Sequence, residues 1–515
     1  MASPLQAFSI SAPGFYGINT QDSSLDLPSG YALIASNCVI DQYGRVGARK
    51  GWTPINTTLA ALGSNDVQAI GELVTRAGVS YTICAGNNKL FKLVGSTLTE
   101  LTYGGGGTAP TITANYWQFA MLLNVFVMFQ SGHDPIYFDP TVSTTTYKRI
   151  SEAAGYTGTV QKSNTVLSAY GRFWNADTAT DKLTIQWCDI NSPFNYSTGT
   201  AGTLDTYTVW PKGGDSVVAL AAHNNNLFIF GKRNILVYTG ANNPATMALA
   251  DTIVGIGCAA RDSIAYTGTD LIFLSETGVR SIMRTIQEKS SPINDLSKNV
   301  RNDLSSLVRS ESNSAKIKSV YSTTDAIYLL TLPSSYITYC FDTKNFLQDG
   351  SSRVTTWDNI NPTSMFFSSD GTLLLGKPGY VASYSGYKDN GLAYRMQYFT
   401  NHLDLGDPSV TTVLKKLTAT VVGGNNQTLI FKWGYDFKGN YYSAPKVIPV
   451  QTMAYYGIDE YGGTATYSNN SLIQSLSVFP NGAGKVIQTG YETDIFGSAL
   501  SIQKIEIFAK NGKLI

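Results

Sequence analysis

Charged residues are what this sequence has least of. Asp, Glu, Lys and Arg make up 14% of the 515 residues and the net charge is +1, whereas roughly 25% is usual. No lysine- or arginine-rich run occurs. Proteins that grip nucleic acid present a basic stripe, because each phosphate contact adds affinity. The composition therefore argues against a protein that holds DNA tightly.

Cysteine is also scarce, and the five cysteines are odd in number and far apart, with no CxxC pair. This pattern disfavours a disulfide scaffold, and it disfavours a zinc site even more. We predict small buried thiols in a protein made in a reducing cytoplasm. The residues are Cys38, Cys84, Cys188, Cys258 and Cys340.

Long hydrophobic runs are missing as well. The start of the chain has neither the basic residues nor the continuous apolar stretch of a signal peptide. The longest apolar run, Phe119–Phe129, contains Asn124 and is far shorter than the roughly 20 residues that cross a bilayer. We expect no secretion signal and no membrane-spanning segment.

Motifs of catalysis and cofactor binding are absent too. GxSxG and HExxH do not occur, and His133, His223 and His402 are scattered. Gly255–Ala260 fits GxGxxA, but a strand pattern follows it where a dinucleotide site needs a helix. We expect no catalytic, cofactor or metal residue, although the many carboxylates leave a glycosidase pair open.

Glycine (48) and tyrosine (31) are abundant, and they accompany apolar runs of strand length. The runs come in pairs and triplets, such as Leu227–Phe230 and Ile235–Tyr238 on either side of Gly231–Asn234. These groups recur roughly every 40–50 residues, a spacing that suits four-stranded propeller blades. We predict an all-β fold with a β-propeller over residues 56–395; six blades are favoured and seven is the alternative.

One segment within this region has helical spacing. Between 294 and 309 the apolar residues recur at intervals of three and four, which marks one face of a helix. Asn294 or Asp295 is placed to cap it. We predict one short helix that lies across the propeller or between blades. Its apolar residues are Leu296, Val300, Leu304, Leu307 and Val308.

Residues 396–515 have well separated strand patterns, and we predict a β-sandwich-like domain there. A tyrosine-dense stretch lies within it. Tyrosine has an apolar ring and a polar tip, so these residues are candidate interface aromatics, with ordinary loop and edge-strand positions as the alternative. They are Tyr441, Tyr442, Tyr455, Tyr456 and Tyr461.

The most specific motifs lie in residues 1–55, which we set apart as an N-terminal arm. Gly17–Thr20 reads GINT, Ala32–Asn37 reads A-L-x-x-x-N, and Gly44–Gly51 reads G-x-x-x-x-R-x-G. In this order they resemble the nozzle, or tail tubular protein B, family of short-tailed bacteriophages. Further elements extend the resemblance to about residue 310: His133–Asp139, Gly171–Trp174, Gly257–Ser263 and Pro292–Asp295.

The resemblance implies a structural protein of the phage tail. It implies a propeller-bearing subunit of a ring, expected to be a hexamer, beside portal, adaptor and tail fibre or spike proteins. Genomic double-stranded DNA would pass through the ring without sequence-specific binding and be held in before infection. A near-neutral lumen with isolated basic residues suits a sliding polyanion. The last third of the chain carries none of the family's motifs.

Arg45, Arg49 and Lys50 form the densest basic group. They are candidates for contact with DNA or an acidic neighbouring subunit. We favour the alternative, a solvated turn or an ion pair with Asp41. The rival to the tail hypothesis as a whole is a tail-associated propeller protein that binds or degrades polysaccharide.

Overall fold

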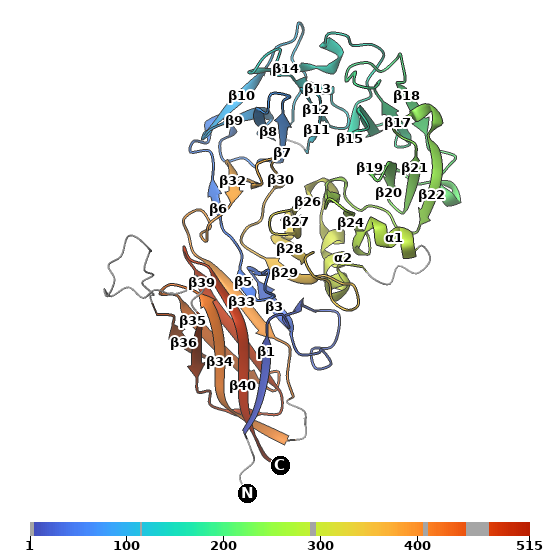
Figure 1. Cartoon of the computed structure of the whole chain (residues 1–515). Coiled ribbons are helices and arrows are strands. Elements are labelled where there is room, and N and C mark those ends of the chain that lie inside the picture. The colour runs from blue at the N-terminus through green and yellow to red at the C-terminus, as the bar shows by residue number, and fades with distance from the viewer. Residues whose placement is uncertain (1–4, 114–115, 289–294, 405–409, 450–472, 515) are drawn as a thin grey trace.

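The computed structural model describes residues 5–113, 116–288, 295–404, 410–449 and 473–514 (Figure 1). Two parts are visible, a ring of sheets and an elongated sandwich below it. Strands dominate and helices are few, so the all-β prediction is confirmed.

The ring is a β-propeller in which the blades follow one another in chain order. Each of the first four blades has four strands that pair antiparallel in chain order, and a parallel pairing between the outer strands of blades 1 and 2 joins these two blades into one eight-stranded sheet. They are β7 (Ala69–Val74), β8 (Ser80–Gly86), β9 (Lys89–Val94) and β10 (Thr97–Tyr103); β11 (Gln118–Leu122), β12 (Val125–Phe129), β13 (Ile136–Phe138) and β14 (Thr146–Arg149); β15 (Ser163–Ala169), β16 (Arg172–Thr178), β17 (Thr184–Trp187) and β18 (Gly202–Asp205); and β19 (Val217–His223), β20 (Asn226–Gly231), β21 (Asn234–Thr239) and β22 (Ala248–Val254).

The remaining three blades depart from this regular pattern. Blade 5 has three strands followed by a helix, and blade 7 takes its outer strand from the N-terminal segment. They are β23 (Ala265–Tyr266), β24 (Leu271–Ser275), β25 (Gly278–Ser281) and α1 (Ile282–Glu288); β26 (Lys318–Ser322), β27 (Ile327–Leu332), β28 (Ile337–Asp342) and β29 (Arg353–Trp357); and β30 (Ser364–Phe367), β31 (Leu373–Lys377), β32 (Tyr380–Tyr384) and β6 (Trp52–Pro54).

The described residues therefore form seven blades, and the preference for six was wrong. Blade 5 opens with a strand of only two residues, and the fourth strand of blade 7 lies about 330 residues before its partner Tyr384. Neither feature leaves a four-strand pattern in the local sequence, so the spacing undercounts the blades.

Tight turns shape the blades. Asn87 and Asn88 have φ of 49° and 56°, and Asn224 and Asn225 have φ of 48° and 60°. Two successive residues with positive φ form the hairpin turn that matches the twist of flanking strands, and asparagine tolerates it well. Each Asn-Asn pair thus joins two adjacent strands, β8 to β9 and β19 to β20.

Hydrophobic side chains hold neighbouring blades together. A separate buried cluster lies at each of six blade interfaces. Trp117 and Phe126, for example, pack against Leu73 and Ile83 between blades 1 and 2. The seventh interface, between blades 5 and 6, belongs to a larger cluster that continues into the sandwich.

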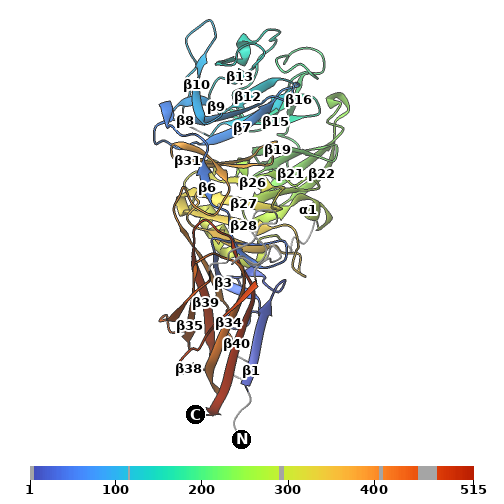
Figure 2. The same ribbon diagram turned by 60° about the vertical axis from the view of Figure 1, so that its left-hand side comes forward.

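The sandwich combines both ends of the chain in two sheets. Sheet A contains strands in the order β37 (Ile473–Val478), β34 (Val410–Gly423), β40 (Leu500–Leu514) and β1 (Leu5–Ser11), and Figure 2 shows β34, β40 and β1 side by side. The short strand β38 (Ala483–Gly484) pairs with β34, β5 (Val46–Ala48) pairs with β40, and β4 (Cys38–Ile40) pairs with β5. Sheet B contains β2 (Gly17–Ile18), β3 (Tyr31–Ser36), β33 (Tyr394–Thr400), β39 (Ile487–Ile495), β35 (Thr428–Tyr435) and β36 (Tyr442–Val447).

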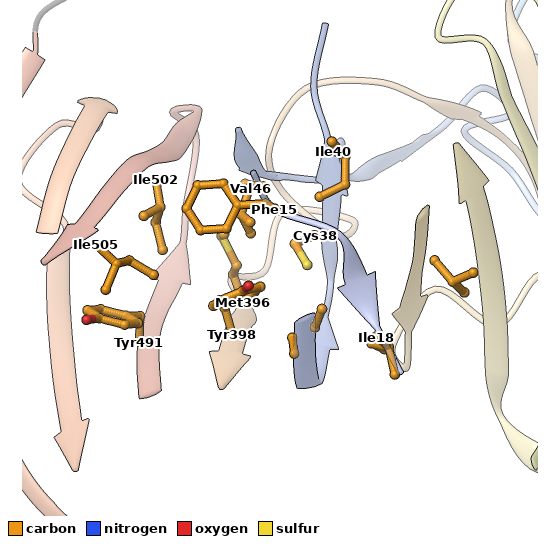
Figure 3. Close-up of a cluster of buried hydrophobic side chains, with 14 of the residues drawn as sticks. Phe15, Ile18, Cys38, Ile40, Val46, Met396, Tyr398, Tyr491, Ile502 and Ile505 are labelled. Atoms are coloured by element: carbon orange, nitrogen blue, oxygen red, sulfur yellow. The ribbon is translucent and has the colours of Figure 1, made fainter. Parts of the chain in front are cut away.

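Residues 5–48, assigned from sequence to an arm, thus supply strands to the sandwich. Figure 3 shows Phe15, Cys38 and Val46 from this segment close to Tyr398 of β33 and Ile502 of β40. Sheet B is also continuous with blade 6, because β29 pairs with β2 and β3 in parallel. The propeller and the sandwich therefore share one ten-stranded sheet.

The helix predicted over 294–309 begins later than expected. A 3-10 turn, Lys298–Val300, leads into α2 (Arg301–Ser310). Asp295 does not cap the helix; its buried carboxylate accepts hydrogen bonds from Ser297 and Arg301. Asn294 lies outside the described residues. Leu304 packs in the cluster at the interface of blades 5 and 6, and α1 was not predicted.

The closing strand of blade 7 gives a test of the propeller. The Ile55 N–H donates to the Val381 carbonyl at 2.8 Å and continues the ladder of β6 on β32. Ile55→Pro removes this donor, so we expect the free energy of unfolding in urea to fall by about 1–3 kcal/mol. Ile55→Val keeps the donor and is the control; equal stability of the two variants would contradict closure by this strand.

Candidate functional site

The propeller channel is a narrow cavity on the ring axis. The first strands of neighbouring blades lie side by side around it, and β30 of blade 7 returns to β7 of blade 1. All seven blades contribute to the lining of a pocket of 540 Å³, which includes Glu72, Phe119, Tyr266 and Phe366. The channel is thus a closed ring of strand edges with mixed polar and apolar walls.

A buried ionic cluster spans this channel. The guanidinium of Arg261, which precedes blade 5, donates to the carbonyls of Asn164 and Tyr116 at 2.6 and 2.7 Å and to Asp262 at 2.8 Å. Lys318 of blade 6 binds the same Asp262 carboxylate. Asn164 belongs to blade 3, and Tyr116 lies two residues before the first strand of blade 2. The cluster therefore links four blades across the axis.

Electrostatics keep this cluster charged. Burial by itself would raise the pKa of Asp262, but Arg261 and Lys318 outweigh it and lower the pKa to about 2. Burial also lowers the pKa of Lys318, and Asp262 offsets part of that effect. The Asp262 carboxylate is thus ionised at neutral pH and forms ion pairs with Arg261 and Lys318. It is not a group that gives up a proton to a substrate.

The predicted basic group lies at the junction of propeller and sandwich, and the structure separates its members. Arg49 is fully buried, with its Nη1 and Nη2 atoms 2.9 and 2.7 Å from the two carboxylate oxygens of Asp389. Its Nε donates to Asn37 at 3.1 Å, and its guanidinium stacks 4.0 Å from the centre of the Tyr394 ring. Burial removes Arg49 from the residues that could touch DNA or another subunit.

Arg49 belongs to a chain of polar contacts through the junction. Asn37 has φ of 54° between β3 and β4, and its amide binds the carboxylate of Asp358, just after β29. Asp389 follows blade 7. The contacts Asp358–Asn37–Arg49–Asp389 thus tie blades 6 and 7 to the sandwich.

Arg45 and Lys50 border an open cleft of 790 Å³ between the two parts. Arg45 pairs with Asp41 at 2.7 Å, the partner named by the alternative reading. Lys50 pairs with Asp325 at 3.1 Å, and Lys344 lies on the same cleft. Both predicted residues are therefore accessible but already paired within the chain.

Of the tyrosines, the described ones lie at the open end of sheet B. Tyr442 is 50% exposed and stacks on Trp433, with ring centres 5.9 Å apart. Tyr441 is 40% exposed and its hydroxyl binds Gln488. Tyr455, Tyr456 and Tyr461 lie outside the described residues.

The channel cluster was not predicted; the one local signal for it is the adjacent pair Arg261–Asp262 in a chain poor in charge. All five cysteines are free and buried, so the prediction of small buried thiols is confirmed. In the described part of the chain, no group of three or more His, Cys, Asp or Glu residues is arranged to hold a metal ion. No helix described there is long and apolar enough to cross a membrane.

Comparisons with known proteins add little beyond this description. No family model and no curated protein matches the sequence. Solved structures that are similar include the WD40 domain of Neurospora crassa Pan2, with 9% identity, TM-score 0.39 and coverage of 65% of this chain and 96% of that one. The WD40 domain of Toxoplasma gondii coronin has 9% identity, TM-score 0.36 and coverage of 74% and 87%.

A bacterial structure is similar over part of its length. The extracellular domain of a one-component system protein from B. thetaiotaomicron has 12% identity and TM-score 0.41, and the match covers 66% of this chain but 40% of that one. Likeness at this level carries no functional argument; the propeller assignment rests on the strand pairing itself.

Loss of Arg49 tests the junction. Removing one partner of a buried ion pair leaves the other charge unpaired, which costs about 3–5 kcal/mol. We expect Arg49→Met to lower the free energy of unfolding by that amount. Arg45→Gln, which breaks a partly exposed pair, should cost at most about 1 kcal/mol. Urea denaturation measures both, and similar losses for the two variants would contradict the structural role of Arg49.

The channel cluster gives a pH test. Because folding lowers the pKa of Asp262, its ionisation stabilises the fold fully above the unfolded pKa near 4, and this stabilisation is lost as pH falls through about 2. Asp262→Asn should therefore be less stable than wild type at pH 7 by about 2 kcal/mol or more, with a gap that narrows between pH 4 and pH 2. Asp205→Asn, at an exposed carboxylate, is the control. A stability difference between Asp262→Asn and wild type that does not change with pH would contradict the role given to the ionised Asp262.

Proposed function

We propose that this chain is a structural subunit of a bacteriophage short tail, a nozzle protein that assembles into a ring and forms part of the conduit for genome ejection. The observation that supports it is the position of the motif residues. Those that carry the family resemblance in residues 17–51 lie where the propeller joins the sandwich, and they meet physical demands that few other residues satisfy.

Two glycines and one arginine illustrate these demands. Gly17 has φ of 81° and pairs with Val354 of β29; a Cβ there would lie 2.4 Å from the Val354 carbonyl oxygen. A Cβ at Gly51 would lie 2.0 Å from the Lys388 carbonyl oxygen. Arg49, between them, anchors Asp389. Gly17 of the GINT motif and Arg49 and Gly51 of the G-x-x-x-x-R-x-G motif thus shape the joint between the two parts of the subunit.

The conduit in this proposal lies between copies of the chain. The 540 Å³ channel of a single propeller is crossed by Arg261, Asp262 and Lys318. Duplex DNA does not fit in this channel, because its major groove alone is about 12 Å wide and about 8.5 Å deep and side chains cross the channel. A DNA conduit therefore requires several copies around a common axis, and a hexamer is the ring order that we propose.

The charge distribution suits a conduit. Net charge is +1, and many of the lysines and arginines are in ion pairs, as Lys298 with Asp349 and Lys432 with Glu492. Attraction to phosphate grows with each unpaired cation, so a wall of this kind lets DNA slide. Portal and adaptor proteins on one side and fibre or spike proteins on the other are the partners that we propose, with the virion tail as location.

The rival function, polysaccharide binding or cleavage, needs an accessible acid in a pocket lined by aromatic rings. The propeller channel supplies aromatic rings, but Asp262 is held by two cations and Glu72 accepts hydrogen bonds from Ser369 at 2.7 and 3.0 Å. Both carboxylates serve as structural acceptors, so the geometry favours the tail function.

Particle imaging tests the proposal. We expect the full-length chain, purified or in particles from infected cells, to form rings whose central channel is bounded by several copies and is wide enough for duplex DNA. Native mass spectrometry of the same sample gives the ring order, with six copies expected.

Two results would contradict the proposal. One is that virus particles contain the chain but that it does not lie in their tails. The other is a monomer that cleaves host polysaccharide, with the cleavage lost in Glu72→Gln but kept in Asp139→Asn, which changes a carboxylate outside the channel lining.

A further inference from the structure

The charge of Glu72 is uncompensated among the residues that line the propeller channel. Glu72 lies on β7, the first strand of blade 1, and its carboxylate accepts hydrogen bonds from the Ser369 N–H at 2.7 Å, from the Ser369 hydroxyl at 3.0 Å and from the Ser80 hydroxyl. All three donors are neutral. Among the described residues, no lysine or arginine forms an ion pair with Glu72. The carboxylate is thus fixed in place as an acceptor, while its negative charge meets no cation.

The ionic cluster of the channel does not neutralise Glu72, because the two lie at different depths. First strands of successive blades run in the same direction, as β7 and β30 do: Ser364 binds the Val67 carbonyl, and Ser369 binds Glu72 five residues further along both strands. Lys318 of the cluster is the first residue of β26, whereas Glu72 is the fourth residue of β7. Three residues of a strand span ~10 Å, so the cluster lies toward one end of the channel and Glu72 toward the other.

Aromatic rings line the channel on both sides of Glu72. Phe366 belongs to the interface of blades 7 and 1, and Phe119 to the interface of blades 1 and 2. A Cβ at Gly71 would lie 2.5 Å from the Phe119 ring, so the glycine lets that ring pack against β7 next to Glu72. Tyr266 of blade 5 lines the same channel and is 56% exposed. Ring faces carry partial negative charge and attract cations, so the rings and the carboxylate favour the same kind of ligand.

These features select among the classes of ligand. An anion would be repelled by Glu72, and a neutral apolar group would take the carboxylate out of water without a charged partner, which is costly. A hard metal ion needs several oxygen ligands, and the described residues hold no group of three or more His, Cys, Asp or Glu arranged for one. An alkylammonium ion meets both demands, since its charge suits the carboxylate and its methyl or methylene groups suit the rings.

We propose that the propeller channel binds an organic ammonium ion, with the charge at Glu72 and the alkyl groups against Phe366 and Phe119. The cavity of 540 Å³ lies within the range of about 300–1,000 Å³ that is usual for small-ligand sites. A free quaternary amine and the side chain of a lysine on a partner protein share this chemistry. The site lies within one chain, so it goes beyond the proposed tail function and does not require the ring.

Matched ligands test the charge on the wild-type chain. Choline is compared with 3,3-dimethylbutan-1-ol, which has carbon in place of the nitrogen, and N-acetyl-lysine amide is compared with N-acetyl-norleucine amide. Calorimetry and ligand-observed NMR measure binding. We expect at least one cation to bind, at least tenfold more tightly than its neutral counterpart, and more weakly as salt is raised. Tighter binding of choline indicates a free quaternary amine, and tighter binding of the lysine amide indicates a partner's side chain. Equal binding of cation and neutral counterpart, or binding of neither cation, would overturn the proposal.

Variants then locate the site. Glu72→Gln removes the charge with little change of shape and should weaken binding of the cation at least tenfold, and Phe366→Leu should weaken it roughly fivefold by removing a ring. The controls are Glu100→Gln, at a carboxylate paired with Lys89 on the outer strands of blade 1, and Phe437→Leu, at an exposed ring of the sandwich. Both should bind as wild type does, and thermal unfolding shows which variants are folded. Unchanged affinity in folded Glu72→Gln would overturn the site and leave the tail function intact, whereas a chain that binds the cation but forms no ring, alone or in particles, would overturn the tail function and leave the site intact.

Discussion

The parallel pairing of β2 and β3 with β29 is the constraint on which the rest of the structure depends. It makes the outer strand of blade 6 an inner strand of a ten-stranded sheet, so the propeller and the sandwich cannot move apart without breaking a ladder. Gly17 permits the approach, because any side chain there would meet the backbone of Val354. The largest buried cluster follows the same path, from blades 5 and 6 into the sandwich.

Buried ion pairs lie both at this joint and in the channel. Buried ion pairs are weak sources of stability, because desolvation offsets their attraction, but they penalise every arrangement that separates the partners. Arg49 with Asp389 fixes the junction, and Arg261 with Asp262 and Lys318 fixes opposite blades. The ring that we propose would need such a fixed angle between the parts of each subunit, since a heterologous contact closes only at one rotation.

What the sequence could predict was what depends on near neighbours. Hairpins such as β20 and β21, and the Asn-Asn turns, follow from residues within one or two positions of each other. The pairing of Trp52–Pro54 with Tyr384, or of Leu5–Ser11 with β40, joins segments hundreds of residues apart, and no local pattern names such partners. For the same reason Arg49 looked like a member of a surface cluster with Arg45 and Lys50; only the fold shows that Asp389 buries it.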